Sequence, residues 1–312
     1  METQIDVKNP KLKRTLERFK AKIAEGDFYE AHQTLRTIAN RNVRSKSYAD
    51  AIDLLYHAAQ ILLKSSQPAT GSDLTSYLIE VYVESETPVT NESKSKLIHL
   101  IQLFSPEEPT LKQVAVESVN WSVKFGDYKF GDPELHHALG SKLVENGALA
   151  YDAEKHLLLG TSASVPLYIK HIWEWYTQDD EATIGVYTLR IVVNYLLVSN
   201  IKAANDALAT ILKNIASERP SLTSEIVTES EYTVSIFETQ PLLNLAQLLL
   251  CTIQKADQKL FKTLRARYNQ AIAQAGYNDA FTLLGEMYFG IAVPKQANFL
   301  QDMMGSFFGA NR

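Results

Sequence analysis

The sequence predicts an all-α fold: an α-solenoid of stacked antiparallel helical hairpins, with one β-hairpin inserted near the C-terminus. Apolar residues recur at helical spacing along most of the chain, which is typical of amphipathic helices. The segments between these patterns are short, as connections between packed antiparallel helices usually are. Residues 224–239 instead alternate β-branched and aromatic residues with polar ones, and this pattern favours strands.

Composition and length are those of a globular chain. The 312 residues are 46% apolar and 21% charged, unlike disordered chains. The length fits two average domains or one extended array, and we expect an N-terminal half over residues 1–150 and a C-terminal half over residues 151–312. A net charge of −5 argues against nonspecific binding of nucleic acid. Up to Lys64, however, 12 Lys and Arg stand against 8 Asp and Glu, so the first segment is basic.

The first helix is expected over residues 11–25, after Pro10 and before Gly26. Two further helical patterns follow, joined by a basic turn at residues 41–46. Small residues where helices approach, alternating with larger ones that interdigitate, are typical of stacked helical hairpins. The stripe of the second pattern consists of Tyr48, Ala51, Ile52, Leu55, Ala58, Ala59 and Leu62.

After a break at residues 65–72, the next helix is expected to begin at Asp73. Asp73, Glu80 and Glu84 lie on a face nearly opposite to its apolar residues, and such a row is often only a solvated face. A small or turn-forming pair, an apolar residue and then Ala recur along the chain, which resembles degenerate tetratricopeptide arrays. The remaining helices are expected over residues 93–104, 111–125, 133–145, 150–158, 165–176, 182–198, 201–215, 241–254, 258–273 and 279–289.

Two segments near the C-terminus stand apart from the helical pattern. Residues 224–239 predict a β-hairpin, which is marginal alone and needs a surface to lie against. The last 20 residues carry large apolar side chains that we expect to be docked on some surface. Those apolar residues are Phe299, Leu300, Met303, Met304, Phe307 and Phe308.

No pattern of catalytic residues is found. The sequence lacks phosphate-binding glycine loops, a GxSxG turn, CxxC pairs and HExxH. His136 and His137 are adjacent on a helix and point about 100 degrees apart, so they are a poor chelating pair. The single cysteine, Cys251, lies in an apolar run, as a buried cysteine does. With no secretory signal and no apolar run long enough to cross a bilayer, we expect a cytoplasmic protein.

Four runs carry a resemblance to a known family: EAHQTLRTIANR, VRSKSY, YKFGDPELH and PKQANFLQDMM. Through them the chain resembles the helical scaffold subunit of the fungal GET pathway, which guides tail-anchored membrane proteins to the endoplasmic reticulum. The resemblance covers the chain from about residue 11 to its end and is thinnest around the hairpin. It implies an all-helical solenoid with a β-hairpin near the C-terminus.

The resemblance also implies a function: a non-enzymatic adaptor that needs no cofactor and no metal. Its N-terminal half would bind the homodimeric targeting ATPase, favour the ATP-bound form and restrain hydrolysis. Its C-terminal half would bind the N-terminal segment of a ubiquitin-like protein, which recruits a co-chaperone carrying tail-anchored clients. Binding to nucleic acid and direct insertion into membranes are not expected.

Site residues follow from the same resemblance. Asp73 and Glu80 would form a separate acidic patch that regulates ATP hydrolysis, although Asp73 could be only a helix-start residue. The alternative for Phe28 is a core position. For Arg41 and Arg44 it is a charge that favours a helix C-terminus. The residues expected to bind the ATPase are Arg14, Phe28, His32, Arg41 and Arg44.

The ubiquitin-like partner is expected at the β-hairpin, through Ile226, Val227, Tyr232, Val234, Ile236 and Phe237. Two other functions compete with this interpretation. One is a helical-repeat subunit of another multiprotein assembly. The other is an all-helical lipid or isoprenoid enzyme, for which Asp179 and Asp180 in a loop are poor metal-binding candidates.

Overall fold

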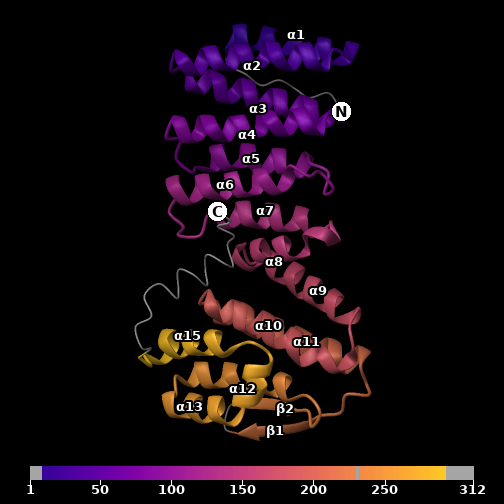
Figure 1. The fold of residues 1–312 in the computed structure, drawn as a ribbon, viewed down its shortest axis with the longest axis vertical. Helices are drawn as coiled ribbons and strands as arrows, with labels where there is room; N and C mark the ends of the chain where they lie inside the picture. The colour runs from indigo at the N-terminus through magenta and orange to yellow at the C-terminus, as the bar shows by residue number, and fades with distance from the viewer. Residues whose placement is uncertain (1–8, 230–231, 293–312) are drawn as a thin grey trace. The chain divides into compact units, whose positions relative to one another are not determined.

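The computed structural model describes residues 9–229 and 232–292, most of which are helical (Figure 1). The predicted all-α solenoid with one β-hairpin is confirmed. The chain divides into two compact units, Met1–Thr161 and Ser162–Arg312. The division falls after Thr161, whereas the sequence places it at residue 150. The elements are α1 (Pro10–Glu25), α2 (Phe28–Arg44), α3 (Tyr48–Lys64), α4 (Pro68–Glu84), α5 (Asn91–Leu103), α6 (Leu111–Phe125), α7 (Pro133–Leu143), η1 (Gly147–Leu149), α8 (Ala150–Leu159), α9 (Ser164–Thr177), η2 (Glu181–Thr183), α10 (Ile184–Leu197), α11 (Ile201–Glu218), β1 (Glu225–Glu229), β2 (Tyr232–Ile236), α12 (Pro241–Lys255), α13 (Gln258–Arg267), α14 (Asn269–Gln274) and α15 (Asn278–Phe289).

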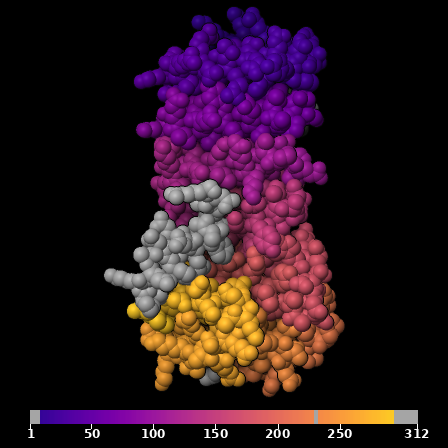
Figure 2. All heavy atoms as spheres, viewed as in Figure 1, coloured from indigo at the N-terminus to yellow at the C-terminus, as the bar shows by residue number. Residues whose placement is uncertain are grey.

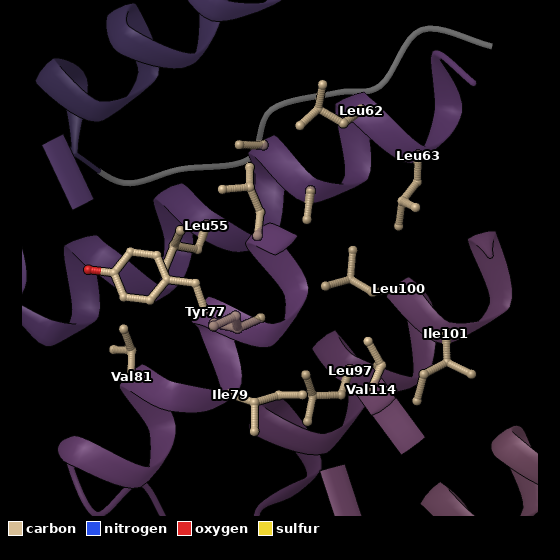
Figure 3. Close-up of a cluster of buried hydrophobic side chains, with 14 of the residues drawn as sticks. Leu55, Leu62, Leu63, Tyr77, Ile79, Val81, Leu97, Leu100, Ile101 and Val114 are labelled. Atoms are coloured by element: carbon tan, nitrogen blue, oxygen red, sulfur yellow. The ribbon is translucent and has the colours of Figure 1, made fainter. Parts of the chain in front are cut away.

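The first unit is a stack of helices in two layers. Helices α1, α3, α5 and α7 contact one another in one layer, and α2, α4 and α6 do so in the other. Apolar side chains from four successive helices meet between the layers (Figure 3). They are Leu55, Leu62 and Leu63 of α3, Tyr77, Ile79 and Val81 of α4, Leu97, Leu100 and Ile101 of α5, and Val114 of α6.

The start of α4 corrects one expectation. The helix begins at Pro68, so residues 68–72 are helical and Asp73 is not a helix-start residue. Pro68 occupies the first turn, where its missing N–H costs no hydrogen bond. A Cβ on Gly71 would lie 2.7 Å from the side chain of Leu63, so this glycine lets α4 pack closely on α3. The residues that suggest a break in the sequence therefore start a helix and set its distance from its neighbour.

Three successive turns share one backbone geometry. Helices α2, α3 and α4 each have 17 residues, and the first three residues after each of them form the same turn, although three further residues separate that turn from α5 after α4. The middle residue of each turn is left-handed: Lys46 (φ 58°), Ser66 (φ 56°) and Glu86 (φ 52°). The residue after it closes the turn with its N–H, as Ser47 does to the carbonyl of Asn42 at 2.8 Å. These turns repeat every 20 residues, a period that the amino-acid types do not reveal.

The second unit contains the β-hairpin. The predicted hairpin is present: β1 and β2 are antiparallel, and β2 lies against α12 (Figure 1). Val227 lies opposite Val234, a register that the sequence did not fix. The helix expected over residues 258–273 is instead two helices, because the chain bends at Tyr268 (φ −99°, ψ 12°). The apolar residues of the last 20 lie outside the described residues.

A buried histidine pair joins α7 and α8. His136 Nε2 lies 2.8 Å from the carbonyl oxygen of Phe130, and its Nδ1 lies 2.9 Å from Nδ1 of His156. A carbonyl only accepts, so Nε2 of His136 carries the proton of the neutral ring, and its Nδ1 accepts a hydrogen bond from the protonated Nδ1 of His156. Burial lowers the pKa of both imidazoles, and the pKa of His156 is also lowered by His136 itself. His137, the neighbour suggested by the sequence, is not the partner in this pair.

Ser66→Gly should raise the free energy of unfolding by about 0.5–1 kcal/mol. The left-handed conformation costs a non-glycine residue about 1–2 kcal/mol, and the greater freedom of glycine in the unfolded chain offsets part of the gain. Urea denaturation followed by circular dichroism measures the change. Ser65→Gly, at a residue with φ −92°, is the matched control and should lower the stability. A loss in both variants would contradict the role of the left-handed turn.

The histidine pair predicts a loss of stability in acid. Both folded-state pKa values lie below the ordinary value of 6.5, so the unfolded chain binds more protons as the pH falls below it. Stability should therefore be full above about pH 6.5 and fall below it. Urea midpoints across this range measure the slope. His156→Gln should flatten it and His137→Gln should not. Equal slopes in wild type and His156→Gln would show that the pair is not its source.

Candidate protein-binding surfaces

Polar side chains run in a row along α2 and along α4, and contacts join His32, Arg36 and Asn40 of α2 to Asp73 and Tyr77 of α4. On α2 the row runs in steps of four residues, one turn apart on one side of the helix. We call the two rows together the α2–α4 polar surface. Its residues are His32, Arg36, Asn40 and Arg44 on α2, and Asp73, Tyr77, Glu80 and Glu84 on α4.

Asp73 is the centre of this surface. One carboxylate oxygen accepts a hydrogen bond from Nε2 of His32 at 2.7 Å, and the other accepts one from the guanidinium of Arg36. The Arg36 guanidinium also lies over the Tyr77 ring, 5.2 Å from its centroid. The Tyr77 hydroxyl donates to Asn40. Asp73 is thus held by two side chains of α2, one of which is the predicted ATPase-binding residue His32.

The pKa of the Tyr77 hydroxyl depends on burial and on four charged groups around it. Burial raises the pKa of its hydroxyl, with smaller contributions from Glu80 and Glu84 that raise it and from Arg36 and Arg44 that lower it. These four charged groups therefore lie within electrostatic reach of one phenol. Glu80 is exposed, as a regulatory contact would require, whereas the side chain of His32 is largely covered. Arg36 was not among the residues predicted from the sequence, although it lies one turn from His32.

Three predicted arginines lie at one end of the first hairpin. Gly26 (φ 88°) turns the chain back on itself between α1 and α2, so the start of α1 lies near the end of α2. A hydrogen bond of 3.0 Å from Asn9 to Asp50 fixes that start beside the α2–α3 turn. Arg14, Arg41 and Arg44 are exposed there, and no ion pair is formed by them within residues 9–229 and 232–292. We call these three residues the arginine end.

The other end of α2 carries two aromatic residues. Phe28, a predicted contact, is half-buried and packs against the core, so only part of its ring is available. Tyr29 beside it is 77% exposed. The sequence does not distinguish these two aromatic residues, because both precede the apolar stripe of α2, which consists of Ala31, Leu35, Ile38 and Ala39. The α1–α2 pair is the first hairpin of the stack in the first unit, seen in indigo in Figure 2.

The β-hairpin is fastened to α12 by two buried amide side chains. Gln247 accepts from the N–H of Ser235 at 2.9 Å and donates to its carbonyl at 2.7 Å. Asn244 does the same for Phe237, at 2.9 and 2.8 Å. The two amides satisfy the outer edge of β2 as a third strand would. A two-stranded sheet that would be marginal alone is thereby held in place.

A groove of about 450 Å³ lies between the hairpin and helices α12 and α13. Strand pairing places Val227, Val234 and Ile236 on the same face of the hairpin. Lys255 lies over the Tyr232 ring, 4.6 Å from its centroid, and Arg267 adds a second cation. We call this the hairpin groove. Its lining residues are Val227, Tyr232, Val234 and Ile236 of the hairpin, Leu248, Cys251, Thr252 and Lys255 of α12, Leu260, Thr263, Leu264 and Arg267 of α13, and Tyr268.

Four of the six predicted hairpin residues line this groove. Ile226 points to the opposite face of the hairpin and is 70% exposed, and Phe237 is buried in the core. The residues from α12 and α13 were missed, because their apolar pattern does not distinguish a groove wall from a core. Cys251 is half-buried in the wall, and burial raises the pKa of its thiol, against a smaller lowering by Lys255. An apolar groove with cations at its edge suits an amphipathic segment.

Within residues 9–229 and 232–292, no group of three or more His, Cys, Asp or Glu side chains could hold a metal ion. In the same part of the chain, no helix is both long and apolar enough to cross a bilayer. The two surfaces described above differ in chemistry, with charged side chains at one and apolar side chains at the other.

Comparisons with known proteins agree on one family. The family model of GET4, Golgi to ER traffic protein 4, matches residues 45–308. Golgi to ER traffic protein 4 of Aspergillus fumigatus is 41% identical, over 97% of this chain and 92% of that protein. The protein of the same name from Schizosaccharomyces pombe is 32% identical, over 93% and 95%. The crystal structure of C. therm. Get4 superimposes with a TM-score of 0.83 and 38% identity, over 96% of both chains. The resemblance noted in the sequence is thereby confirmed, and the chain belongs to the Golgi to ER traffic protein 4 family.

Proposed function

We propose that the protein is a non-enzymatic cytosolic adaptor of the GET pathway that holds two partners at chemically different surfaces. The first unit binds the ATP-bound homodimeric targeting ATPase and restrains its hydrolysis. The second unit binds the N-terminal segment of a ubiquitin-like protein, which recruits the co-chaperone that carries tail-anchored clients. Membership of the family supports the pathway. The observation that most supports two partners is the contrast between a charged surface on one unit and an apolar groove on the other.

The arginine end supports a polar contact with the ATPase. Its three arginines are exposed and form no ion pair within the described residues, so their charges are available to acidic groups of a partner. Exposed charges mainly accelerate association and are screened by salt. The exposed ring of Tyr29 offers an aromatic contact at the other end of α2. Such an interface forms quickly and is readily released.

Affinity capture of the full chain from cell extract, followed by mass spectrometry, tests the proposed function. We expect both the targeting ATPase and the ubiquitin-like protein to be recovered. A helical-repeat subunit of another assembly would instead recover several large subunits and no targeting ATPase. That result would overturn the proposal.

Arg41→Glu with Arg44→Glu should weaken binding to the ATPase by about tenfold or more at low salt, because like charges then face each other. Surface-immobilised ATPase and a salt series measure the affinity and its slope. Lys202→Glu with Lys213→Glu is the matched control, since it makes the same change of charge on exposed residues of α11. Unchanged affinity in the arginine variant would remove these residues from the interface.

Asp73→Lys with Glu80→Lys should release ATP hydrolysis more than it lowers affinity. Reversing Asp73 breaks its bonds to His32 and Arg36, and the network over Tyr77 is then rearranged. Turnover of the ATPase, saturated with each variant, measures the restraint separately from binding. Glu107→Lys with Glu238→Lys, both exposed, controls for net charge. If affinity and restraint fell together, the two residues would belong to the anchoring contact.

A further inference from the structure

The hairpin groove leaves apolar side chains partly uncovered by the described residues. Val227 is 42% exposed on the hairpin side, and Leu260 is 39% exposed on the α13 side. Both line the same groove of about 450 Å³. A concave apolar surface of this kind is a docking site for another segment. The question is which segment covers it.

The described chain ends beside this groove. The ring of Phe289, the last residue of α15, stacks on Phe261 of α13 with centroids 4.6 Å apart. The carbonyl of Phe289 accepts a hydrogen bond of 2.9 Å from Gln258, the first residue of α13. Leu260, two residues further along α13, already belongs to the groove wall. Phe289, three residues before the end of the described chain, therefore lies next to one end of the groove.

The sequence of that segment has the pattern of a short amphipathic helix. Asn298 and Gln301 have the types and spacing of a helix start, and Gly309 suits a helix end. Ten helical residues extend about 15 Å, the same length as the ten residues of α13. The six residues 293–298 can span up to about 20 Å. The apolar residues fall on one helical face, at Phe299, Leu300, Met303, Met304, Phe307 and Phe308.

We propose that residues 299–308 dock as an amphipathic helix in the hairpin groove of the same molecule. A helix this short is marginal in water, so an apolar surface is needed to stabilise it. Its two methionines can adapt to an irregular wall. Asp302, on the polar side, is complementary in charge to Lys255 and Arg267 at the groove. If the ubiquitin-like protein binds this groove, as the proposed function states, it must displace the chain's own end.

Cys251 provides the test, because it is the single cysteine of the chain and lines the groove. Its rate of reaction with a maleimide is measured in the full chain without any partner. Leu300→Asp with Met304→Asp puts charges on the apolar face, so the tail should no longer cover Cys251. The reaction should then be about tenfold faster than in wild type, where a short tether keeps the tail at a millimolar effective concentration near the groove. Gln301→Asp with Ser306→Asp adds the same charge on the polar face and should react as wild type.

A peptide of residues 293–312 should slow the reaction again when it is added to the Leu300→Asp, Met304→Asp variant. In Leu260→Asp, whose fold is checked by circular dichroism, Cys251 should react fast and the peptide should have no effect. Equal rates in wild type and in both tail variants would overturn the proposal. Protection that increases with chain concentration would also overturn it, since a second copy would then cover the groove.

Affinity for the ubiquitin-like protein separates this inference from the proposed function. If the tail covers the partner's site, the Leu300→Asp, Met304→Asp variant should bind that partner about tenfold more tightly than wild type. Protection of Cys251 by the tail without any change in partner affinity would support docking of the tail. It would place the partner's site elsewhere, which contradicts the proposed function and not the docking.

Discussion

Each helix of the stack has an apolar stripe that it cannot cover by itself, and the rest of the structure depends on this constraint. Helix α3 buries residues on more than one side, including Leu54, Leu55 and Leu62, because it has neighbours in both layers. Burying one such side chain stabilises the fold by roughly 1.5–3 kcal/mol. The absence of a side chain at Gly71 lets α4 approach α3 closely, and the apolar stripes of the two helices then pack against each other. Polar residues lie mostly on the outer faces, where the candidate binding surfaces are found.

The two surfaces use this scaffold in different ways. The α2–α4 polar surface is a network in which Asp73 is shared by His32 and Arg36, so a partner that contacts one of these residues alters the others. The hairpin groove is an apolar wall whose shape depends on Gln247 and Asn244. A charged surface suits rapid, salt-sensitive exchange of a partner, and an apolar one suits a lasting complex.

The sequence was sufficient for the features that depend on local periodicity. Most helix positions and the presence of a β-hairpin follow from spacing. The four predicted residues that line the groove came from the family resemblance, and the register of the hairpin was not fixed by the sequence. Contacts between positions far apart in the sequence cannot be predicted in this way. Asp73, for example, pairs with His32 at a sequence separation of 41 and with Arg36 at a separation of 37. The left-handed turns were not predicted, because the residues with positive φ are Lys46, Ser66 and Glu86 and not glycines. The start of α4 was misplaced because Pro68 and Gly71 suggest a break as readily as a helix start and a close contact.

The 20-residue period of the turns has a consequence for how the chain folds. Two helices and their turns take about 40 residues, and side-chain hydrogen bonds between α-helices of the same layer in the first unit stay within that range. They include Asn9 to Asp50 at a separation of 41, Tyr77 to Asn40 at 37 and Tyr56 to His99 at 43. Each of these hydrogen bonds can form once about 40 further residues of the chain have been synthesised. Successive helical hairpins of the first unit can therefore pack one after another as the N-terminal half leaves the ribosome, before the groove of the second unit has been synthesised.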